Sequence, residues 1–229
     1  DHLTAESANC LLKTLEEPPP DSLLILIGTN PHRQLPTIRS RCQLTRFRPL
    51  AGEHVLTLLR RDGLVSDPEL AERLIRVCGG SLTRARQLSD PANLDFRTAW
   101  WQCLCTPDPD PVDRSKRLSQ FVDAGGKEAP ARRERLSMAI DFAIEFLRGA
   151  IRRSCGMPLG DSELEAALQA HPVACDAEAL AAGIVRCIAA QQQLESNANL
   201  ATLLETWLDE LGRILRHGAY HPTALEYAL

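Results

Sequence analysis

The side chain with the clearest chemical potential in this sequence is Arg41, which lies between Ser40 and Cys42. A guanidinium is planar, permanently charged and able to donate two parallel hydrogen bonds to phosphate oxygens. We expect Ser40, a small polar residue at a turn, and Cys42, a small residue entering the next segment, to position it. From spacing alone the alternative is a surface arginine, since arginines are mostly exposed.

The sequence contains no phosphate-binding loop of the form Gly-x-x-x-x-Gly-Lys-Ser/Thr. Without such a loop and a magnesium carboxylate, a chain cannot hydrolyse ATP by itself. A phosphate contact by Arg41 would then be made to a nucleotide that another subunit binds. We therefore expect no cofactor on this chain, with ATP and magnesium held on a neighbouring subunit.

Apolar spacing predicts the elements that position Arg41. A helix is predicted from Thr4 to about Glu17, where three consecutive prolines end it. The aliphatic run 23–27 predicts a strand buried on both faces, and the alternation at 43–47 predicts a second, short strand. Thr29 closes the first of these runs, at the edge where ligands bind in open α/β sheets. A simple strand-terminating hydroxyl is an equal alternative there.

From Ala51 onward the apolar period is helical. Three short helices are predicted between residues 51 and 90, the second beginning at Asp67 and Pro68. Beyond Pro91 every candidate element is a helix, and the longer ones span 93–105, 132–153, 163–170, 176–196 and 200–217. We place the domain boundaries at 48–50 and 89–91.

Composition limits the classes of function. The net charge is −4, yet arginine outnumbers acidic residues 11 to 6 between residues 31 and 90. A basic middle fits local contact with phosphates, and a solvated charged surface is the even alternative. The total charge is too acidic for a dedicated nucleic-acid binder. No apolar stretch is long enough to cross a bilayer, and no secretory signal is visible, so we expect a cytoplasmic protein without a membrane partner.

The sequence holds eight cysteines, and most lie inside apolar helical patterns. We interpret them as reduced, buried residues of a chain that is long enough to form a core without disulfides. Cys103 and Cys105 lack the spacing of a zinc site and have no second pair nearby. We therefore expect no metal site.

Two stretches together resemble a known family. Residues 8–19 (Ala-Asn-Cys-Leu-Leu-Lys-Thr-Leu-Glu-Glu-Pro-Pro) and 37–43 (Thr-Ile-Arg-Ser-Arg-Cys-Gln) resemble the segment after the Walker B strand and the Ser-Arg-Cys motif of bacterial clamp-loader subunits. The resemblance is strong over about the first 50 residues and weaker beyond, where residues 197–200 (Asn-Ala-Asn-Leu) support it. It is nearer the delta-prime type of DNA polymerase III than the ATP-hydrolysing gamma/tau type.

The resemblance implies a mostly α fold in three parts. Residues 1–49 would be the second half of an AAA+ α/β core, residues 50–90 a small three-helix lid, and residues 91–229 an all-helical collar for oligomerisation. In this family the Walker A and Walker B elements precede the stretch that resembles residues 8–19. We therefore expect the sequence to be the C-terminal portion of such a subunit.

The resemblance also implies roles and partners. Arg41 would be an arginine finger given in trans, Thr29 would match the sensor-one residue, and Arg84 would match the sensor-two arginine. Arg84 lies one position later than in gamma-type ATPases, and a solvated lid arginine is the alternative that we favour. The implied partners are gamma/tau, delta, the sliding clamp and primed DNA. The alternatives are a fragment of a gamma/tau-type ATPase and a helical scaffold without ring function.

Overall fold

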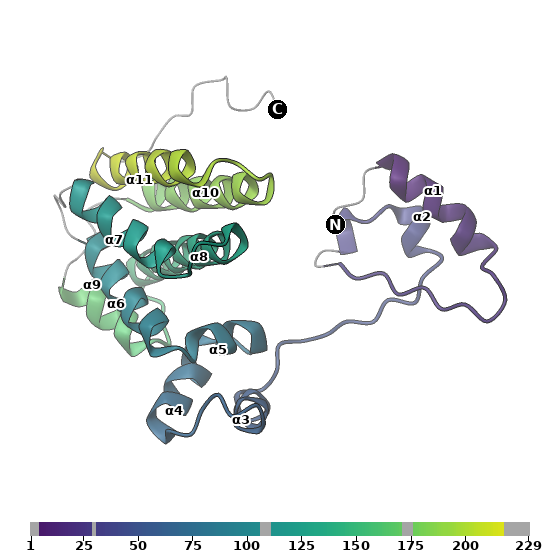
Figure 1. Ribbon diagram of the computed structural model, residues 1–229, viewed down its shortest axis with the longest axis horizontal. Coiled ribbons are helices and arrows are strands. Elements are labelled where there is room, and N and C mark those ends of the chain that lie inside the picture. Colours follow the sequence, from purple (N-terminus) through teal and green to yellow (C-terminus); the bar gives the residue numbers. More distant parts are fainter. Residues whose placement is uncertain (1–4, 29–30, 106–110, 171–175, 218–229) are drawn as a thin grey trace. The chain divides into compact units, whose positions relative to one another are not determined.

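The computed structural model describes residues 5–28, 31–105, 111–170 and 176–217. The chain separates into two compact units, residues 1–49 and residues 50–229. Figure 1 shows the elements of each unit. The first unit contains α1 (Ala5–Glu16), the 3₁₀ turn η1 (Pro31–Arg33) and α2 (Pro36–Arg39).

The first unit is built on the contact between α1 and α2. Ala8 on α1 and Ile38 on α2 are the buried apolar residues described here. The predicted apolar face of α1 is confirmed, because Leu11, Leu12 and Leu15 are half-buried while the intervening residues are exposed. The helix ends at Glu16, two residues before the prolines, which cannot donate to a helical ladder.

The two predicted strands are wrong. The segments 23–27 and 43–47 are irregular, and the described residues contain no strand. A strand needs a neighbour to receive its backbone hydrogen bonds, and no neighbour lies beside these segments in the described part of this unit. The side chains of Leu23 and Ile27 are accordingly 83% and 92% exposed, whereas a core strand would bury them. The α/β character expected of residues 1–49 is therefore not observed.

The second unit begins with three short helices, α3 (Gly52–Arg61), α4 (Pro68–Val77) and α5 (Leu82–Leu88), which pack on one another. The predicted start of α4 is confirmed: the Asp67 carboxylate accepts from the backbone N–H groups of Glu69 and Leu70, and Pro68 occupies the first turn. Gly79 and Gly80 have positive φ, which lets the chain reverse between α4 and α5.

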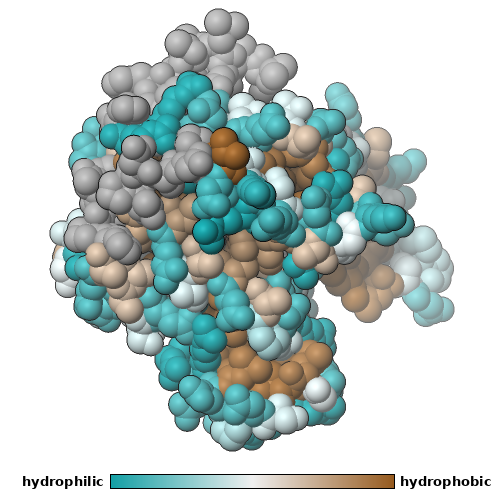
Figure 2. All heavy atoms as spheres, turned by 60° about the vertical axis from the view of Figure 1, so that its left-hand side comes forward, coloured by the Kyte–Doolittle hydropathy of each residue, from teal (hydrophilic) through white to brown (hydrophobic). Residues whose placement is uncertain are grey.

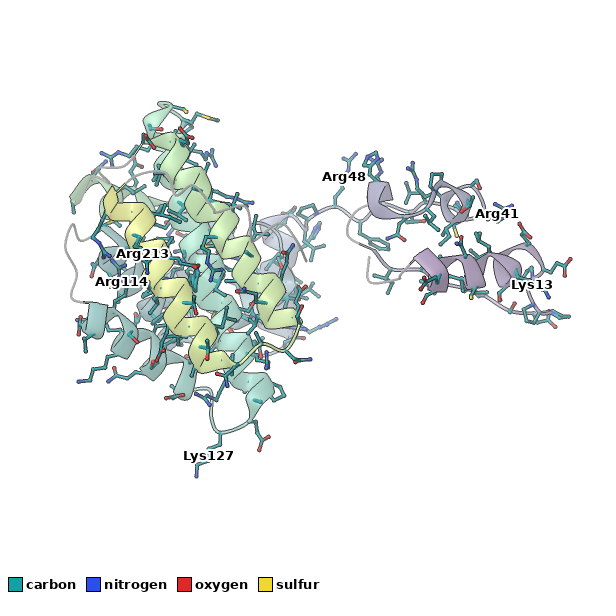
Figure 3. The ribbon with its side chains drawn as sticks, turned by 90° about the horizontal axis from the view of Figure 1, so that it is seen from above. Lys13, Arg41, Arg48, Arg114, Lys127 and Arg213 are labelled. Carbon is teal, nitrogen blue, oxygen red and sulfur yellow. The ribbon has the colours of Figure 1, made fainter. Side chains whose placement is uncertain are left out.

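Six further helices lie in the described part of the second unit, and the predicted long helices are confirmed to within a few residues. They are α6 (Pro91–Cys105), α7 (Pro111–Asp123), α8 (Ala129–Ser154), α9 (Ser162–Ala170), α10 (Ala177–Glu195) and α11 (Leu200–His217). In Figures 1 and 3, α10 and α11 lie side by side as a layer over α8. The helix α6 packs against α8 and α9, and α7 packs against α8 and α11.

Large aromatic side chains fill the core of the second unit. Trp100, Trp101 and Trp207 are fully buried together with Phe142 and Phe146. The indole N–H of Trp101 donates to the carbonyl oxygen of Phe142 at 2.9 Å, which ties α6 to α8. Burying aromatic groups of this size stabilises the unit, because each removes a large apolar area from water.

The mostly α fold class is confirmed, since the regular elements of the described residues are all helical. The assignment of residues 50–90 to a lid and 91–229 to a collar stays a prediction.

The face shown in Figure 2 is mostly hydrophilic, with a hydrophobic patch at its lower end, where α3 and α4 lie. Among the described helices none combines the length and apolarity that crossing a membrane requires.

The seven described cysteines have free thiols, as predicted. Cys78, Cys105 and Cys187 are buried, but Cys10 and Cys155 are exposed, so the prediction of burial is wrong for those two. Burial raises the pKa of Cys105 to about 11 and that of Cys187 to about 12. These two thiols are therefore protonated at neutral pH and act as small apolar residues.

Candidate functional site

Arg41 follows the last turn of α2. Pro36 occupies the first turn of this short helix, and Ser40 ends it, with the Ser40 N–H donating to the carbonyl oxygen of Pro36 at 2.9 Å. The Arg41 N–H donates to the carbonyl oxygen of Ile38 at 3.1 Å. Because Ile38 is buried against the rest of the first unit, the backbone of Arg41 is fixed relative to α1.

The guanidinium of Arg41 is oriented by three neighbours. Its Nη2 lies 2.6 Å from Oε1 of Glu16, the last residue of α1. Its Nη1 donates to the carbonyl oxygen of Thr37 at 3.0 Å and approaches Oγ of Ser40 at 3.4 Å. Figure 3 shows Arg41 on the first unit, together with Lys13 and Arg48.

This ion pair is at the surface. The side chains of Arg41 and Glu16 are 36% and 50% exposed. An exposed pair of this kind stabilises a fold by about 0–1 kcal/mol. The contact is thus strong enough to bias the orientation of the guanidinium and weak enough for a phosphate to replace the carboxylate.

The neighbours of Arg41 have different environments. The Ser40 hydroxyl donates to the carbonyl oxygen of Thr37 at 3.0 Å, so it shares the acceptor that Arg41 uses. Cys42 is half-buried with a free thiol, and Arg39 is exposed. Thr29, the predicted sensor-one residue, lies outside the described residues. The roles assigned to these residues stay predictions.

Arg84, the second predicted sensor, belongs to the other unit, on α5. Its Nη2 donates to Oε2 of Glu145 at 2.7 Å, and its Nε donates to the carbonyl oxygen of Val77 at 3.1 Å. The side chain is half-buried in these contacts rather than solvated, which differs from the surface arginine that we favoured. Its role as a sensor stays a prediction.

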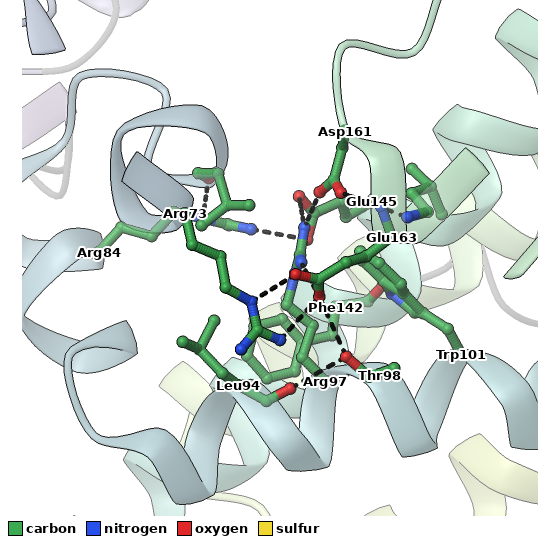
Figure 4. A network of polar contacts seen from close by, with 12 residues as sticks. Arg73, Arg84, Leu94, Arg97, Thr98, Trp101, Phe142, Glu145, Asp161 and Glu163 are labelled. Carbon is green, nitrogen blue, oxygen red and sulfur yellow. Dashed lines mark hydrogen bonds and ion pairs between the residues drawn. The ribbon is translucent and has the colours of Figure 1, made fainter. Parts of the chain in front are cut away.

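Arg84 belongs to a network of charged side chains, drawn in Figure 4, and it joins this network through Glu145. Arg97 of α6 lies at the centre of the network. Arg97 has no exposed surface and makes two hydrogen bonds to Glu145, at 2.9 and 3.1 Å. It also donates to Asp161, and its Cζ lies 3.8 Å from the centre of the Trp101 ring. One buried cation therefore joins α6, α8 and the start of α9.

A second arm of the network reaches α4. Arg73 donates to both carboxylate oxygens of Glu163 on α9, and the Thr98 hydroxyl lies 3.2 Å from the same carboxylate. Burial alone would raise the pKa of Glu163, but the hydrogen bond and charge of Arg73 hold it below its usual value. Burial alone would lower the pKa of Arg97, but the hydrogen bonds and charges of Glu145 and Asp161 raise it above its usual value. The network thus keeps its charges and joins residues 50–90 to residues 91–170.

Sequence reasoning missed this network, although one signal was present. Arg97 lies at helical spacing from Leu94, Trp100 and Trp101, all of which are buried. An arginine on the apolar face of a helix predicts a buried cation, which requires carboxylate partners. Its partners Glu145 and Asp161 are 48 and 64 residues away, so nothing in the sequence identifies them.

Within the described ranges, no three His, Cys, Asp or Glu side chains gather in a way that could hold a metal ion. Among the residues that the sequence predicts to do chemistry, Arg41 has an oriented and partly exposed guanidinium. On its own this group can bind an anion or stabilise a developing negative charge.

Comparison with known proteins shows which class of protein this chain resembles. A family model described as "DNA polymerase III, delta subunit" matches residues 1–51, the part of the chain that carries Arg41. The DNA polymerase III subunit gamma/tau of Mycobacterium tuberculosis H37Rv is 40% identical over 83 residues, 34% of this chain and 14% of that protein. The chain is thus similar to subunits of DNA polymerase III.

Within that class, similarity to the delta' subunit covers more than half of the chain in two relatives. The delta' subunit of Escherichia coli K12 is 33% identical over 148 residues, 65% of this chain and 43% of that protein. The delta' subunit of Bacillus subtilis 168 is 27% identical over 209 residues, 90% of this chain and 61% of that protein. The chain therefore spans less than two thirds of either relative. The resemblance to a delta-prime-type clamp-loader subunit is confirmed.

Proposed function

We propose that this chain acts as a delta-prime-type subunit of the DNA polymerase III clamp loader and places Arg41 against ATP held by a neighbouring subunit. The complex would use that ATP to load the sliding clamp onto primed DNA, with magnesium held beside the nucleotide on the neighbour. The expected partners are gamma/tau and delta, and we place the activity in the cytoplasm. The chain itself would contribute no nucleotide site.

The observation that carries this proposal is the position of Arg41. Its guanidinium is partly exposed, and its described contacts are one surface carboxylate and two oxygens of its own turn. When the γ-phosphate of ATP is transferred, negative charge spreads over its equatorial oxygens, and a guanidinium can stabilise that charge through two parallel hydrogen bonds. Replacing Glu16 by a phosphate loses at most about 1 kcal/mol, whereas an arginine finger contributes about 10³–10⁵ in rate.

Reconstitution of the complex tests the role of Arg41. We expect Arg41→Ala to leave assembly intact and to lower DNA-stimulated ATP hydrolysis by at least about 10³-fold, because transition-state charge loses its counter-ion. Arg39→Ala is the matched control: it removes an exposed arginine from the same helix end and should change the rate by less than about twofold. Equal rates for Arg41→Ala and the unaltered chain would reject the proposal.

We propose that an apolar part of the surface of α10 contacts other subunits of the complex. Val185 and Ile188 are exposed, large and apolar, and they lie three residues apart, which makes them neighbours on the surface of the helix. Residues that share one face of a helix can pack into a groove between helices of a partner. We expect Val185→Asp with Ile188→Asp to weaken assembly with gamma/tau or delta at least tenfold, as measured by sedimentation. Glu178→Lys, an exposed change on the same helix, should leave assembly unchanged.

A gamma/tau-type ATPase is the second candidate, because the gamma/tau relative is 40% identical over the residues it shares with this chain. That match covers about a third of the chain, whereas the delta' match of Bacillus subtilis covers 90%. Equilibrium binding of ATP to the natural protein, without partner subunits, separates the two candidates. Micromolar binding would favour the ATPase, and failure to bind would favour the delta-prime type.

A further inference from the structure

A groove of about 450 Å³ lies in the second unit, between the end of α4 and start of α5 on one side and α8 and α9 on the other. Cationic and anionic side chains both line it. The arginines are Arg76, Arg84, Arg148 and Arg152, and the carboxylates are Asp141, Glu145 and Asp161. Nothing in the role proposed above uses this groove.

The carboxylates of the groove already have partners behind its wall. Arg97, which does not line the groove, binds both Glu145 and Asp161 from the protein interior, as Figure 4 shows. The carboxylate of Asp141 accepts a hydrogen bond from the Gln191 amide at 2.5 Å. Burial raises the pKa of Asp141, and the charges of Arg84 and Arg148 partly oppose that rise. Together with Arg97, the four arginines of the groove therefore face three carboxylates, which leaves a net positive charge.

The arginines, in contrast, retain free donors. Each guanidinium has five N–H groups, and Arg152 donates from Nη2 to the carbonyl oxygen of Pro158 at 2.7 Å. Arg76 lies 3.7 Å from Glu72, an exposed pair of little strength. Arg148 is exposed, and its charge acts on Asp141, but among the described residues no hydrogen bond or ion pair holds its guanidinium.

The placement of these charges is unfavourable without a ligand. Arg148 and Arg152 are four residues apart on α8 and share one face of the helix. Like charges at this spacing destabilise a helix by about 0.2–0.5 kcal/mol. Arg84 brings a third cation from α5 to the same groove. An anion that binds between them would relieve this repulsion.

We propose that this groove binds a phosphate-bearing anion, either a free polyphosphate or the backbone of a nucleic acid. Cations that converge from two sides suit a compact group with several charged oxygens. A peptide carries its carboxylates singly and several ångströms apart, so it matches this arrangement less well. Arg148 and Arg152 would contact the phosphate through free N–H groups, and Arg84 would add a third cation while it stays bound to Glu145.

Binding to the full chain tests the proposal with two probes: inorganic triphosphate by calorimetry and a fluorescent 20-nucleotide oligothymidine by anisotropy. Binding of either probe, weakened at least about tenfold by Arg148→Gln with Arg152→Gln, supports the site. Displacement of the oligonucleotide by triphosphate assigns it to nucleic acid, and binding of triphosphate alone assigns it to a free phosphate. Arg213→Gln, an exposed arginine of α11 that pairs with Asp209, is the control and should leave both affinities unchanged.

Three outcomes would overturn the proposal. The first is that neither probe binds below about 1 mM at low salt. The second is that the double variant, folded by its thermal transition, binds like the unaltered chain. The third is that polyglutamate of similar charge binds more tightly than triphosphate, which would make the groove a peptide site.

Discussion

Arg97 allows a quantitative test of how the second unit is held together. In the Arg97→Met variant, an apolar side chain of similar length replaces a cation that has no exposed surface. Glu145 would keep Arg84 as a partner, but Asp161 would keep only the N–H groups of Glu163 and Leu164 at the start of α9. The change therefore leaves two half-buried carboxylates with less positive charge than they now have.

The expected loss of stability follows from these contacts. Removing one partner of a buried ion pair typically destabilises a protein by 3–5 kcal/mol, and the contact of Arg97 with the Trp101 ring adds about 0.5–2 kcal/mol. Glu145 and Asp161 are 23% and 11% exposed, so water compensates part of the loss. We therefore expect a decrease of about 3–4 kcal/mol in the free energy of unfolding, or about 6–16 °C in Tm.

Urea denaturation followed by tryptophan fluorescence measures this change, because the three tryptophans all lie in the second unit. Arg213→Met, on the exposed face of α11, should cost less than about 0.5 kcal/mol. The combination of Arg97→Met with Glu145→Gln and Asp161→Asn removes the uncompensated charges and should recover part of the loss. A decrease below about 1 kcal/mol for Arg97→Met alone would refute the reasoning.

Two further predictions concern the same unit. Because the pKa of Glu163 is held below its usual value of 4.5, its ionised form stabilises the fold above that pH, and this contribution is lost as the pH falls through the lowered pKa. Denaturation at several pH values should thus show that Glu163→Gln destabilises the fold most at pH 7 and progressively less as the pH falls below 4.5, and an equal effect at every pH would contradict the charge pairing. A Cβ on Gly149 would lie 2.5 Å from Cδ2 of Leu164, so Gly149→Val should lower the free energy of unfolding by about 1–3 kcal/mol through overpacking of α8 on α9, and unchanged stability would show that α9 can move aside.

The helices were predictable because their signals are local. Asp67, Pro68 and the glycines at 79 and 80 mark the two ends of α4 without reference to the rest of the chain. The same holds for α8, whose apolar period runs through its length. Local patterns of this kind need no tertiary partner to be recognised.

The errors arose where structure depends on distant partners. The run 23–27 has the composition of a core strand, but a strand exists only beside another strand, and the described residues supply none. The ion network depends on pairs separated by 48–90 residues, for which a sequence has no local mark. The orientation of Arg41 belongs to the same class, because Glu16 and Arg41 meet only after α1 and α2 have packed.

The proposed role of Arg41 differs from a simple binding role in one measurable respect. An arginine that contacts the transferring phosphate should strengthen binding of the transition state far more than binding of ATP. The ion pair with Glu16 provides a second test of this role, because Glu16→Gln releases the guanidinium of Arg41 from the carboxylate without removing it. We expect this variant to keep most of the activity of the assembled complex.

The most direct test measures the affinity of the assembled complex for ADP with aluminium fluoride, a mimic of the transferring phosphate, and for a non-hydrolysable ATP analogue. We expect Arg41→Ala to weaken the transition-state mimic by at least about 10³-fold and the ATP analogue by less than about tenfold. Equal weakening of the two ligands, or no weakening of either, would contradict the claim that Arg41 stabilises charge in a neighbour's reacting nucleotide.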